Sequence, residues 1–138
     1  MECLPVARLP EGVEWVYELK LDGYRAQAIR DANGVRLLSR NGKDLGKKYP
    51  HVVQALANAL MLETVVDGEL VAFDDAGRPD FNSMQRAGPD TVVVFFAFDL
   101  VMDRGMDLKG FPLIKRRALL EANLITSDLV QCSEHFSG

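Results

Sequence analysis

Residues 18–25 constrain the fold most, because apolar and charged side chains alternate along them until a glycine interrupts the pattern. The apolar residues stand at odd positions and the charged ones at even positions, namely Trp15, Tyr17, Leu19 and Leu21 against Glu18, Lys20 and Asp22. A period of two predicts a half-buried β-strand with Lys20 on its polar face. After Gly23 the polar positions become odd, which predicts a bend or bulge that returns Arg25 to the side of Lys20.

Apolar periodicity and turn residues predict the other elements. Strands are expected on both sides of the bend within residues 13–30, and Asn33-Gly34 predicts a tight turn into a strand over 35–39, since Asn-Gly adopts positive φ readily. Pro50 and apolar residues at helical spacing predict a helix over 49–62. The remaining predictions are strands over 64–73, 91–101 and 128–132, helices over 81–86 and 112–124, and a turn over 74–79.

The position of charged residues within these elements predicts which of them are buried and which are exposed. Residues 91–101 are almost wholly apolar, which predicts a strand buried on both faces, so Asp99 within it must find a partner. Asp67 and Glu69 fall on one face of their strand, and Asp67 is interpreted as a turn or strand-edge residue. The basic residues 115–117 are interpreted as a solvated helix face.

Composition limits the classes of function. With 138 residues and 48% hydrophobic content, the chain is long enough for one domain with a substantial core. A net charge of -4 and a pI near 5.1 argue against binding duplex DNA through overall basicity, so the basic segment 36–48 is the best local candidate. The lack of a long apolar run or secretory signal predicts a cytoplasmic protein. Cys3 and Cys132 are expected to be free thiols.

Four motifs, in order along the chain, resemble those of one family. Lys20-Leu21-Asp22-Gly23-Tyr24-Arg25 resembles the Lys-x-Asp-Gly-x-Arg signature of covalent nucleotidyltransferases, which are ATP-dependent DNA ligases, RNA ligases and mRNA capping enzymes. Three later segments resemble the next motifs of ATP-dependent DNA ligases, namely Ser39-Arg40-Asn41-Gly42, Asp67-Gly68-Glu69 and Phe95-Phe96-Ala97-Phe98-Asp99-Leu100. Residues 112–117 and 133–136 are most similar to the ligase module of bacterial double-strand-break end-joining systems.

The resemblance implies an α+β fold of antiparallel or mixed β-sheets flanked by helices, the nucleotidyltransferase (ATP-grasp-like) adenylation domain. Residues 1–138 would form a truncated version of that domain. The family's Glu-Gly and Lys-x-Lys motifs, and the oligonucleotide-binding barrel that follows them, have no counterpart after Asp99. We therefore expect the chain alone to be inactive or impaired in nick sealing.

The resemblance also implies the roles of the site residues. Lys20 is expected to attack the α-phosphate of ATP, with Mg²⁺ as cofactor, and to form a lysyl-AMP intermediate for DNA nick sealing. Arg40 and Lys43 are expected to contact DNA, and no metal ligand is assigned. The expected ATP-binding residues are Glu18 at the adenine amino group, Phe98 stacked on adenine, Glu69 at the ribose, Arg25 and Arg40 at phosphates, and Asp22 in orientation.

Two other functions stay open at this level. An RNA ligase or capping enzyme shares the Lys20 signature but uses another acceptor or GTP, and the DNA-ligase-like segments 39–42 and 95–100 disfavour it. A non-catalytic remnant that binds a nucleotide or a partner would keep the fold without completing adenylation. The expected partners are ATP, nicked or broken double-stranded DNA, a C-terminal ligase segment and end-joining proteins, with no membrane.

Overall fold

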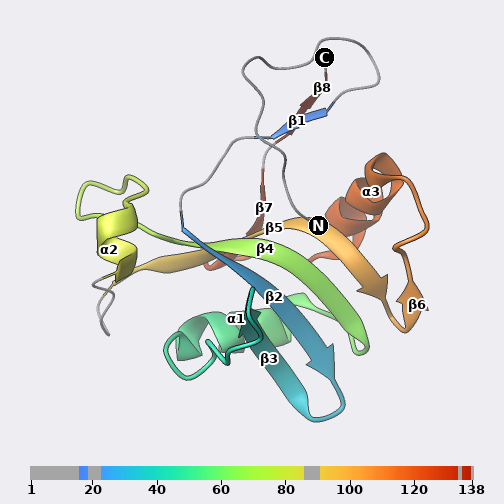
Figure 1. Cartoon of the computed structure of the whole chain (residues 1–138), viewed down its shortest axis with the longest axis horizontal. Coiled ribbons are helices and arrows are strands. Elements are labelled where there is room, and N and C mark those ends of the chain that lie inside the picture. Colours follow the sequence, from blue (N-terminus) through green and yellow to red (C-terminus); the bar gives the residue numbers. More distant parts are fainter. Residues whose placement is uncertain (1–15, 19–22, 86–90, 134, 138) are drawn as a thin grey trace.

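The computed structural model describes residues 16–18, 23–85, 91–133 and 135–137. Figure 1 shows a twisted main sheet with helices packed around it. Six strands form this sheet in the order β3-β2-β4-β5-β6, with β7 paired to β5, and β1 and β8 form a second, two-stranded sheet. The strands are β1 (Val16–Glu18), β2 (Tyr24–Asp31), β3 (Gly34–Ser39), β4 (Thr64–Ala72), β5 (Val93–Asp103), β6 (Met106–Asp107), β7 (Val130–Cys132) and β8 (His135–Ser137). The helices are α1 (Pro50–Ala59), α2 (Phe81–Gln85) and α3 (Leu113–Asn123).

Strand pairing confirms the predicted α+β class with a mixed sheet. All neighbouring strands of the main sheet run antiparallel except β7, which runs parallel to β5. β4 lies in the middle of the sheet, between β2 and β5. The segment between β4 and β5 contains α2, and α3 lies between β6 and β7.

The β2–β3 hairpin forms where the sequence predicts it. Asp31 pairs with Gly34 across the turn, and the Asp31 carboxylate accepts a hydrogen bond from the Asn33 backbone N–H at 2.9 Å. Gly34 has a φ of 123°, whereas Asn33 is not among the residues with positive φ. The turn therefore depends on the freedom of the glycine alone.

Helix α1 is shorter than the predicted 49–62 helix. It begins at Pro50, as a proline in the first turn favours, and buries Val52, Leu56 and Ala59 at helical spacing. It ends at Ala59 because the backbone at Leu60 is extended (φ -111°, ψ 140°), and the chain then turns back toward β4. Glu63, with a φ of 58°, lies in that turn.

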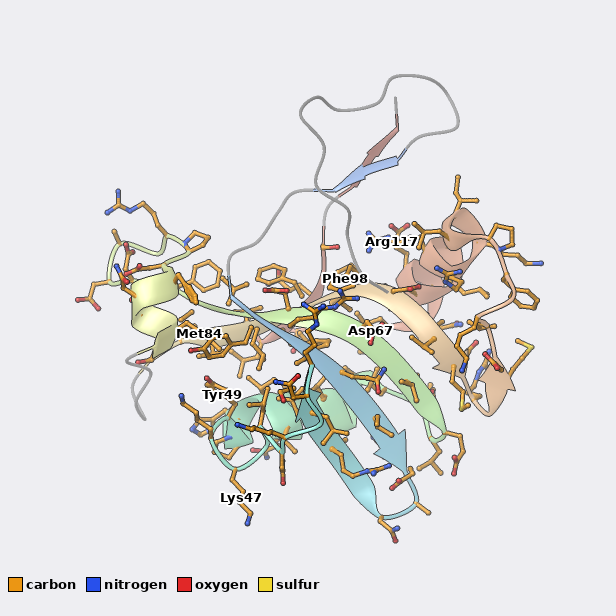
Figure 2. The ribbon with its side chains drawn as sticks, in the orientation of Figure 1. Lys47, Tyr49, Asp67, Met84, Phe98 and Arg117 are labelled. Carbon is orange, nitrogen blue, oxygen red and sulfur yellow. The ribbon has the colours of Figure 1, made fainter. Side chains whose placement is uncertain are left out.

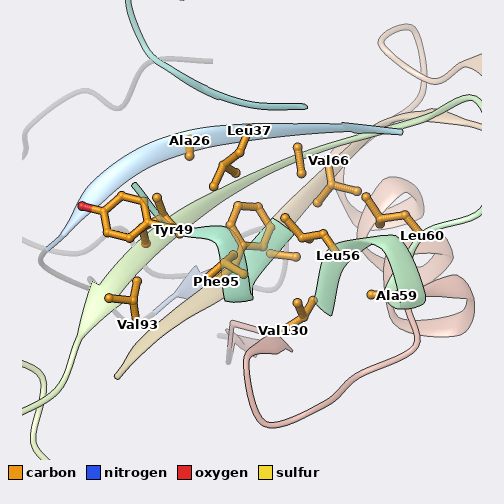
Figure 3. Close-up of a cluster of buried hydrophobic side chains, with 14 of the residues drawn as sticks. Ala26, Leu37, Tyr49, Leu56, Ala59, Leu60, Val66, Val93, Phe95 and Val130 are labelled. Carbon is orange, nitrogen blue, oxygen red and sulfur yellow. The ribbon is translucent and has the colours of Figure 1, made fainter. Parts of the chain in front are cut away.

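The core lies between one face of the main sheet and helices α1 and α3. Figure 3 shows Phe95 from β5 beside Leu56 from α1 in the middle of the buried cluster. Gly68 on β4 makes room for that ring, because a Cβ at residue 68 would lie 2.4 Å from Cζ of Phe95. Leu120 of α3 belongs to the same cluster, so the two helices share one core.

Strand β5 differs from its prediction in extent and in burial. It runs over 93–103 rather than 91–101, because β6 continues its pairing at residues 102 and 103. Phe96 and Phe98 are only half-buried, so the strand is not buried on both faces. The short strands β6 and β8 have no sequence signal of their own, since two or three residues become a strand only through a partner.

Two class predictions concern membranes and thiols. Within the described ranges, no helix has both the length and the apolar character needed to cross a bilayer. Cys132 is a free thiol, as predicted, and burial raises its pKa. Cys3 lies outside the described residues.

Candidate functional site

One face of the main sheet carries polar side chains from neighbouring strands. On β2, Ala26 is buried in the core, so Arg25 and Gln27 lie on the opposite face. The β2–β4 register sets Arg25 opposite Glu69 and Gln27 opposite Asp67. Directly paired side chains on one face of a sheet are close enough to interact, so two polar pairs lie side by side here.

A bulge in β5 adds Phe98 to this face. The β4–β5 register passes from Gly68 opposite Ala97 to Asp67 opposite Asp99, which leaves Phe98 as an extra residue in the ladder. A bulge of this kind redirects a side chain and bends its strand. The half-buried Phe98 ring is thereby presented beside the paired residues of β2 and β4.

Arg25 and Phe98 are in contact across the sheet. The guanidinium carbon of Arg25 lies 5.3 Å from the centroid of the Phe98 ring, within the range of a cation–π interaction. Figure 2 shows Phe98 and Asp67 near each other over the middle of the sheet. Arg25, Glu69 and Phe98, three of the predicted site residues, therefore come together from three strands.

A cavity of about 410 Å³ lies between this face and the turn after β3. The Ser39 hydroxyl accepts a hydrogen bond from the Lys43 backbone N–H at 3.0 Å, and Gly42, with a φ of 81°, completes the turn. This turn places Arg40, which is exposed, at the edge of the cavity. Lys43 is also exposed, but it is not among the lining residues. The lining includes Arg25, Gln27, Ser39, Arg40, Gly42 and Asp67.

Three predicted site residues fall where the structure gives no side chain. Lys20 and Asp22 lie outside the described residues, and only the backbone of Glu18 is described, within β1. The chain resumes at Gly23, where a Cβ would lie 1.9 Å from the carbonyl oxygen of Leu70 on β4. The predicted bend is present, and its glycine permits close backbone contact with the central strand rather than a positive φ.

Asp67 is not the turn or strand-edge residue that its sequence context suggests. It lies in the middle of β4, which has a neighbouring strand on each side. Its Oδ1 accepts a hydrogen bond from the side-chain amide of Gln27 at 3.0 Å. The interpretation fails because single-strand periodicity does not tell a central strand from an edge strand.

Asp99 finds its predicted partner on α3. Its carboxylate is 4% exposed and accepts two hydrogen bonds from Arg116, from Nε at 2.8 Å and from Nη2 at 3.3 Å. The solvated-face interpretation of residues 115–117 is therefore wrong for two of the three. Lys115 is exposed, but the Arg116 side chain is 13% exposed and the Arg117 side chain only 3%, because α3 packs on β5 and turns both arginines toward it.

Asp99→Asn is expected to destabilise the protein by about 2 kcal/mol, because hydrogen bonds to a charged group contribute more than neutral ones and the buried Arg116 would lose its counter-charge. Chemical denaturation monitored by circular dichroism measures this. Asp107→Asn is the matched control, since that carboxylate is exposed and lies 3.9 Å from Lys109. Equal free energies of unfolding for the two variants would contradict the assigned role of the pair.

Metal-ligating side chains do not gather in the part of the chain that the structure describes. No three His, Cys, Asp or Glu residues there form a group able to hold an ion. Asp67 lines the cavity, and Glu69 is paired with Arg25 on the same face. His51, Cys132 and the acidic residues elsewhere do not add to them.

Comparisons with known proteins point to one family. The profile described as "ATP dependent DNA ligase domain" matches residues 7–138. The chain is 45% identical over 126 residues to the multifunctional non-homologous end joining protein LigD of Pseudomonas aeruginosa, covering 89% of this chain and 15% of that protein. It is 46% identical over 109 residues to LigD of Mycobacterium tuberculosis, covering 78% of this chain and 14% of that protein. The chain thus spans about one seventh of these curated relatives.

Solved structures share the fold. The structure titled "mycobacterial DNA ligase D complexed with ATP and MES" superposes with a TM-score of 0.72 at 38% identity, covering 90% of this chain and 42% of that one. The ligase domain of M. tuberculosis LigD gives the same TM-score and identity, over 90% of this chain and 41% of that one. The predicted arrangement of sheets and flanking helices is confirmed by this likeness.

Proposed function

The chain belongs to the family of ATP-dependent DNA ligase domains, and on this premise we propose that the face described above is the nucleotide-transfer site of a DNA ligase. The observation that carries the proposal is the meeting of Arg25, Glu69 and Phe98 on one face, beside a cavity bordered by Arg40. An aromatic ring, a carboxylate and two guanidinium groups are the groups that a base, a ribose and phosphates require. The chain's relatives are DNA ligases, which favours a DNA rather than an RNA or capping substrate.

The proposed reaction joins Lys20 to AMP. The Nζ lone pair attacks the α-phosphorus of ATP, a P–N bond forms, the P–O bond to the leaving pyrophosphate breaks, and the amine releases one proton to solvent. Only the neutral amine is a nucleophile, and a free lysine has a pKa of about 10.4, so the site must favour the neutral form through burial and nearby cations such as Arg25. Asp22 acts in the opposite direction, so we assign it to orientation.

Chain connectivity supports this assignment of Lys20. Lys20 precedes Gly23 by three positions, which limits their α-carbons to a separation of about 11 Å. Gly23 itself lies against Leu70 of β4, one strand position from the Arg25–Glu69 pair. A lysine at position 20 is therefore within reach of a nucleotide that occupies the site face.

The nucleotide contacts follow from the same geometry. Phe98 offers its ring to the adenine, and Glu69 offers charge-assisted acceptors to the ribose hydroxyls. Glu18 is assigned to the adenine amino group by the family pattern. Arg25 and Arg40 offer planar donor forks to phosphate oxygens and would stabilise the charge that develops as pyrophosphate leaves.

Mg²⁺ is proposed to accompany ATP rather than to reside in the protein. This ion usually keeps several waters and binds through substrate phosphates plus one or two carboxylates. Asp67, whose carboxylate borders the cavity, fits that mode of binding. When bound, the ion would neutralise phosphate charge.

The second substrate is proposed to be the 5′ phosphate of nicked or broken duplex DNA. Arg40 and Lys43 lie on the exposed turn after β3 and supply local positive charge to a chain with a net charge of -4. Such a contact is electrostatic, so DNA affinity should fall as salt rises. The two curated relatives are end-joining proteins, which supports the joining of broken ends, with other end-joining proteins as partners, as the setting.

ATP is expected to bind more tightly than GTP, and Phe98→Leu is expected to weaken ATP binding about tenfold, because stacking on an aromatic ring contributes roughly 1–3 kcal/mol per base. Isothermal titration calorimetry with both nucleotides measures this. Phe111→Leu is the matched control, because that ring is also covered by a cation, with Lys115 Nζ 5.0 Å from its centroid, but lies two residues before α3. Equal affinity for ATP and GTP would remove the adenine assignment.

A further inference from the structure

We propose that Arg117 is a positioning residue that holds the β5 bulge and thereby sets the orientation of the Phe98 ring for base stacking. The inference rests on the proposed function of Phe98, and it adds a residue on α3 to a site otherwise built from strands. Arg117 lies 19 positions from Phe98 in the sequence and is buried, and it is not among the residues that line the cavity.

Arg117 binds the carbonyl of the bulged residue. Phe98 is the extra residue between the Gly68–Ala97 and Asp67–Asp99 pairs, so its carbonyl is offset from the regular β4–β5 ladder. Nη1 of Arg117 donates to this oxygen at 3.2 Å. A partly buried backbone acceptor displaced from its ladder is stabilised by such a donor, since a backbone carbonyl shielded from water is costly to leave unsatisfied.

Arg117 is itself held by several acceptors. Its side chain is 3% exposed, and Nη2 donates to the Ser133 carbonyl at 2.6 Å, while Nη1 also donates to the Ser133 hydroxyl at 3.1 Å. Glu121, one turn later on α3, accepts from Nη2 at 3.3 Å. One planar guanidinium thus connects α3, the β5 bulge and the residue after β7, which a lysine ammonium cannot do with the same geometry.

The residue that follows the bulge, Asp99, is also bound by α3. Arg116 holds the Asp99 carboxylate and also donates to the Phe111 carbonyl at 2.6 Å. The carbonyl of Phe98 and the side chain of Asp99 are therefore both attached to α3 through consecutive arginines. Figure 2 shows Arg117 on α3 and Phe98 over the adjoining strand. The orientation of the Phe98 ring therefore depends on the position of α3, because the backbone on the C-terminal side of Phe98 is attached to that helix.

A purely structural arginine and a positioning arginine predict different ligand selectivity. Loss of an arginine that only stabilises the fold lowers the affinity for every ligand equally or for none. Loss of an arginine that positions the stacking ring lowers the affinity for a ligand that has a base. It leaves unchanged the affinity for inorganic tripolyphosphate, which has only the phosphates. The test therefore measures the ratio of affinities for ATP and tripolyphosphate.

Calorimetric titration of both ligands is made on the whole chain and on Arg117→Lys, Phe98→Leu and the double variant. Arg117→Lys is expected to lower ATP affinity about tenfold, the loss of roughly one stacking interaction, and to change tripolyphosphate affinity by less than about twofold. When Phe98 is already replaced by Leu, adding Arg117→Lys is expected to lower ATP affinity by less than about a further twofold. Arg104→Lys, at the far end of β5 and paired with Asp103, is the control and should match the wild type.

Ser133→Ala provides a second, milder variant, since it removes one of the hydrogen bonds that hold the guanidinium. Ser133→Ala should lower the ratio of ATP affinity to tripolyphosphate affinity by a smaller factor than Arg117→Lys does. If Arg117→Lys does not fold, Ser133→Ala is the variant compared with the wild type. Equal losses for both ligands, or a tenfold loss that persists without the Phe98 ring, would overturn the inference while leaving the proposed function intact. A wild-type chain that binds ATP no better than tripolyphosphate would refute the proposed function and the inference with it.

Discussion

Lys20→Ala is expected to abolish covalent transfer of AMP from ATP to the chain. In the proposed reaction the bond forms between Nζ of Lys20 and the α-phosphorus, so removal of the amine removes the nucleophile. The measurement is incubation with ATP labelled at the α-phosphate, followed by denaturing electrophoresis and peptide mapping. The mapped peptide should contain Lys20 in the wild type, and the variant should carry no label.

Two further variants separate the nucleophile from its charge. Lys20→Arg keeps a positive charge but stays protonated at every accessible pH, so it should also carry no label. Lys109→Ala removes an exposed lysine beside β6 and should keep full labelling. Label in Lys20→Ala, or its loss in Lys109→Ala, would contradict the assignment of the nucleophile.

Gly23→Ala is expected to lower the free energy of unfolding by about 4 kcal/mol, among the largest effects of single substitutions. The added methyl group would lie 1.9 Å from the Leu70 carbonyl oxygen and 3.3 Å from Cα of Val71, and both atoms belong to the backbone of the central strand. A backbone atom cannot rotate away as a side chain can, so β2 and β4 must separate. Denaturant unfolding followed by circular dichroism measures the loss.

The same substitution should reduce AMP labelling, because it would push Gly23 away from the sheet, and Lys20 precedes Gly23 by only three positions. Gly110→Ala is the matched control: nothing lies within 4 Å of its Cβ position, and its stability should stay within about 0.5 kcal/mol of wild type. A Gly23→Ala protein as stable as Gly110→Ala would show that the strands can separate at little cost.

Elements with strong local signals are predicted well from the sequence. The turn at residues 31–34, the helix that begins at Pro50 and the turn at residues 74–79 all form, because each depends on neighbouring residues. At residues 74–79 the Asp74 carboxylate accepts from the Ala76 and Arg78 backbone N–H groups, at 2.9 and 3.0 Å. These hydrogen bonds to the charged form lower the pKa of Asp74, with the Arg78 backbone contributing most.

Element ends are predicted less well, since they depend on distant parts of the chain. α1 stops at Ala59 rather than residue 62 because the chain must return to the sheet at Thr64. β5 extends to Asp103 because the two residues of β6 pair with its end. Such contacts join residues that no local pattern connects.

The sequence by itself determined the class of the fold and part of the candidate site. Alternation with a period of two places Arg25 with Gln27, and Asp67 with Glu69, whichever strands come to lie beside them. The ordered motifs named the family, which the comparisons confirm. The role of Lys20 stays a prediction, as do those of Glu18 and Asp22.

Only the tertiary structure decided which of these faces meet and what supports them. Register places Arg25 opposite Glu69, and the β5 bulge brings Phe98 beside them, because an extra residue in one strand is detectable only against its partner. Arg116 and Arg117 look like a solvated pair in the sequence, since burial of a helix face depends on what packs against it. In the fold they bind the bulge, because buried acceptors at Asp99 and Phe98 need donors that water cannot supply there.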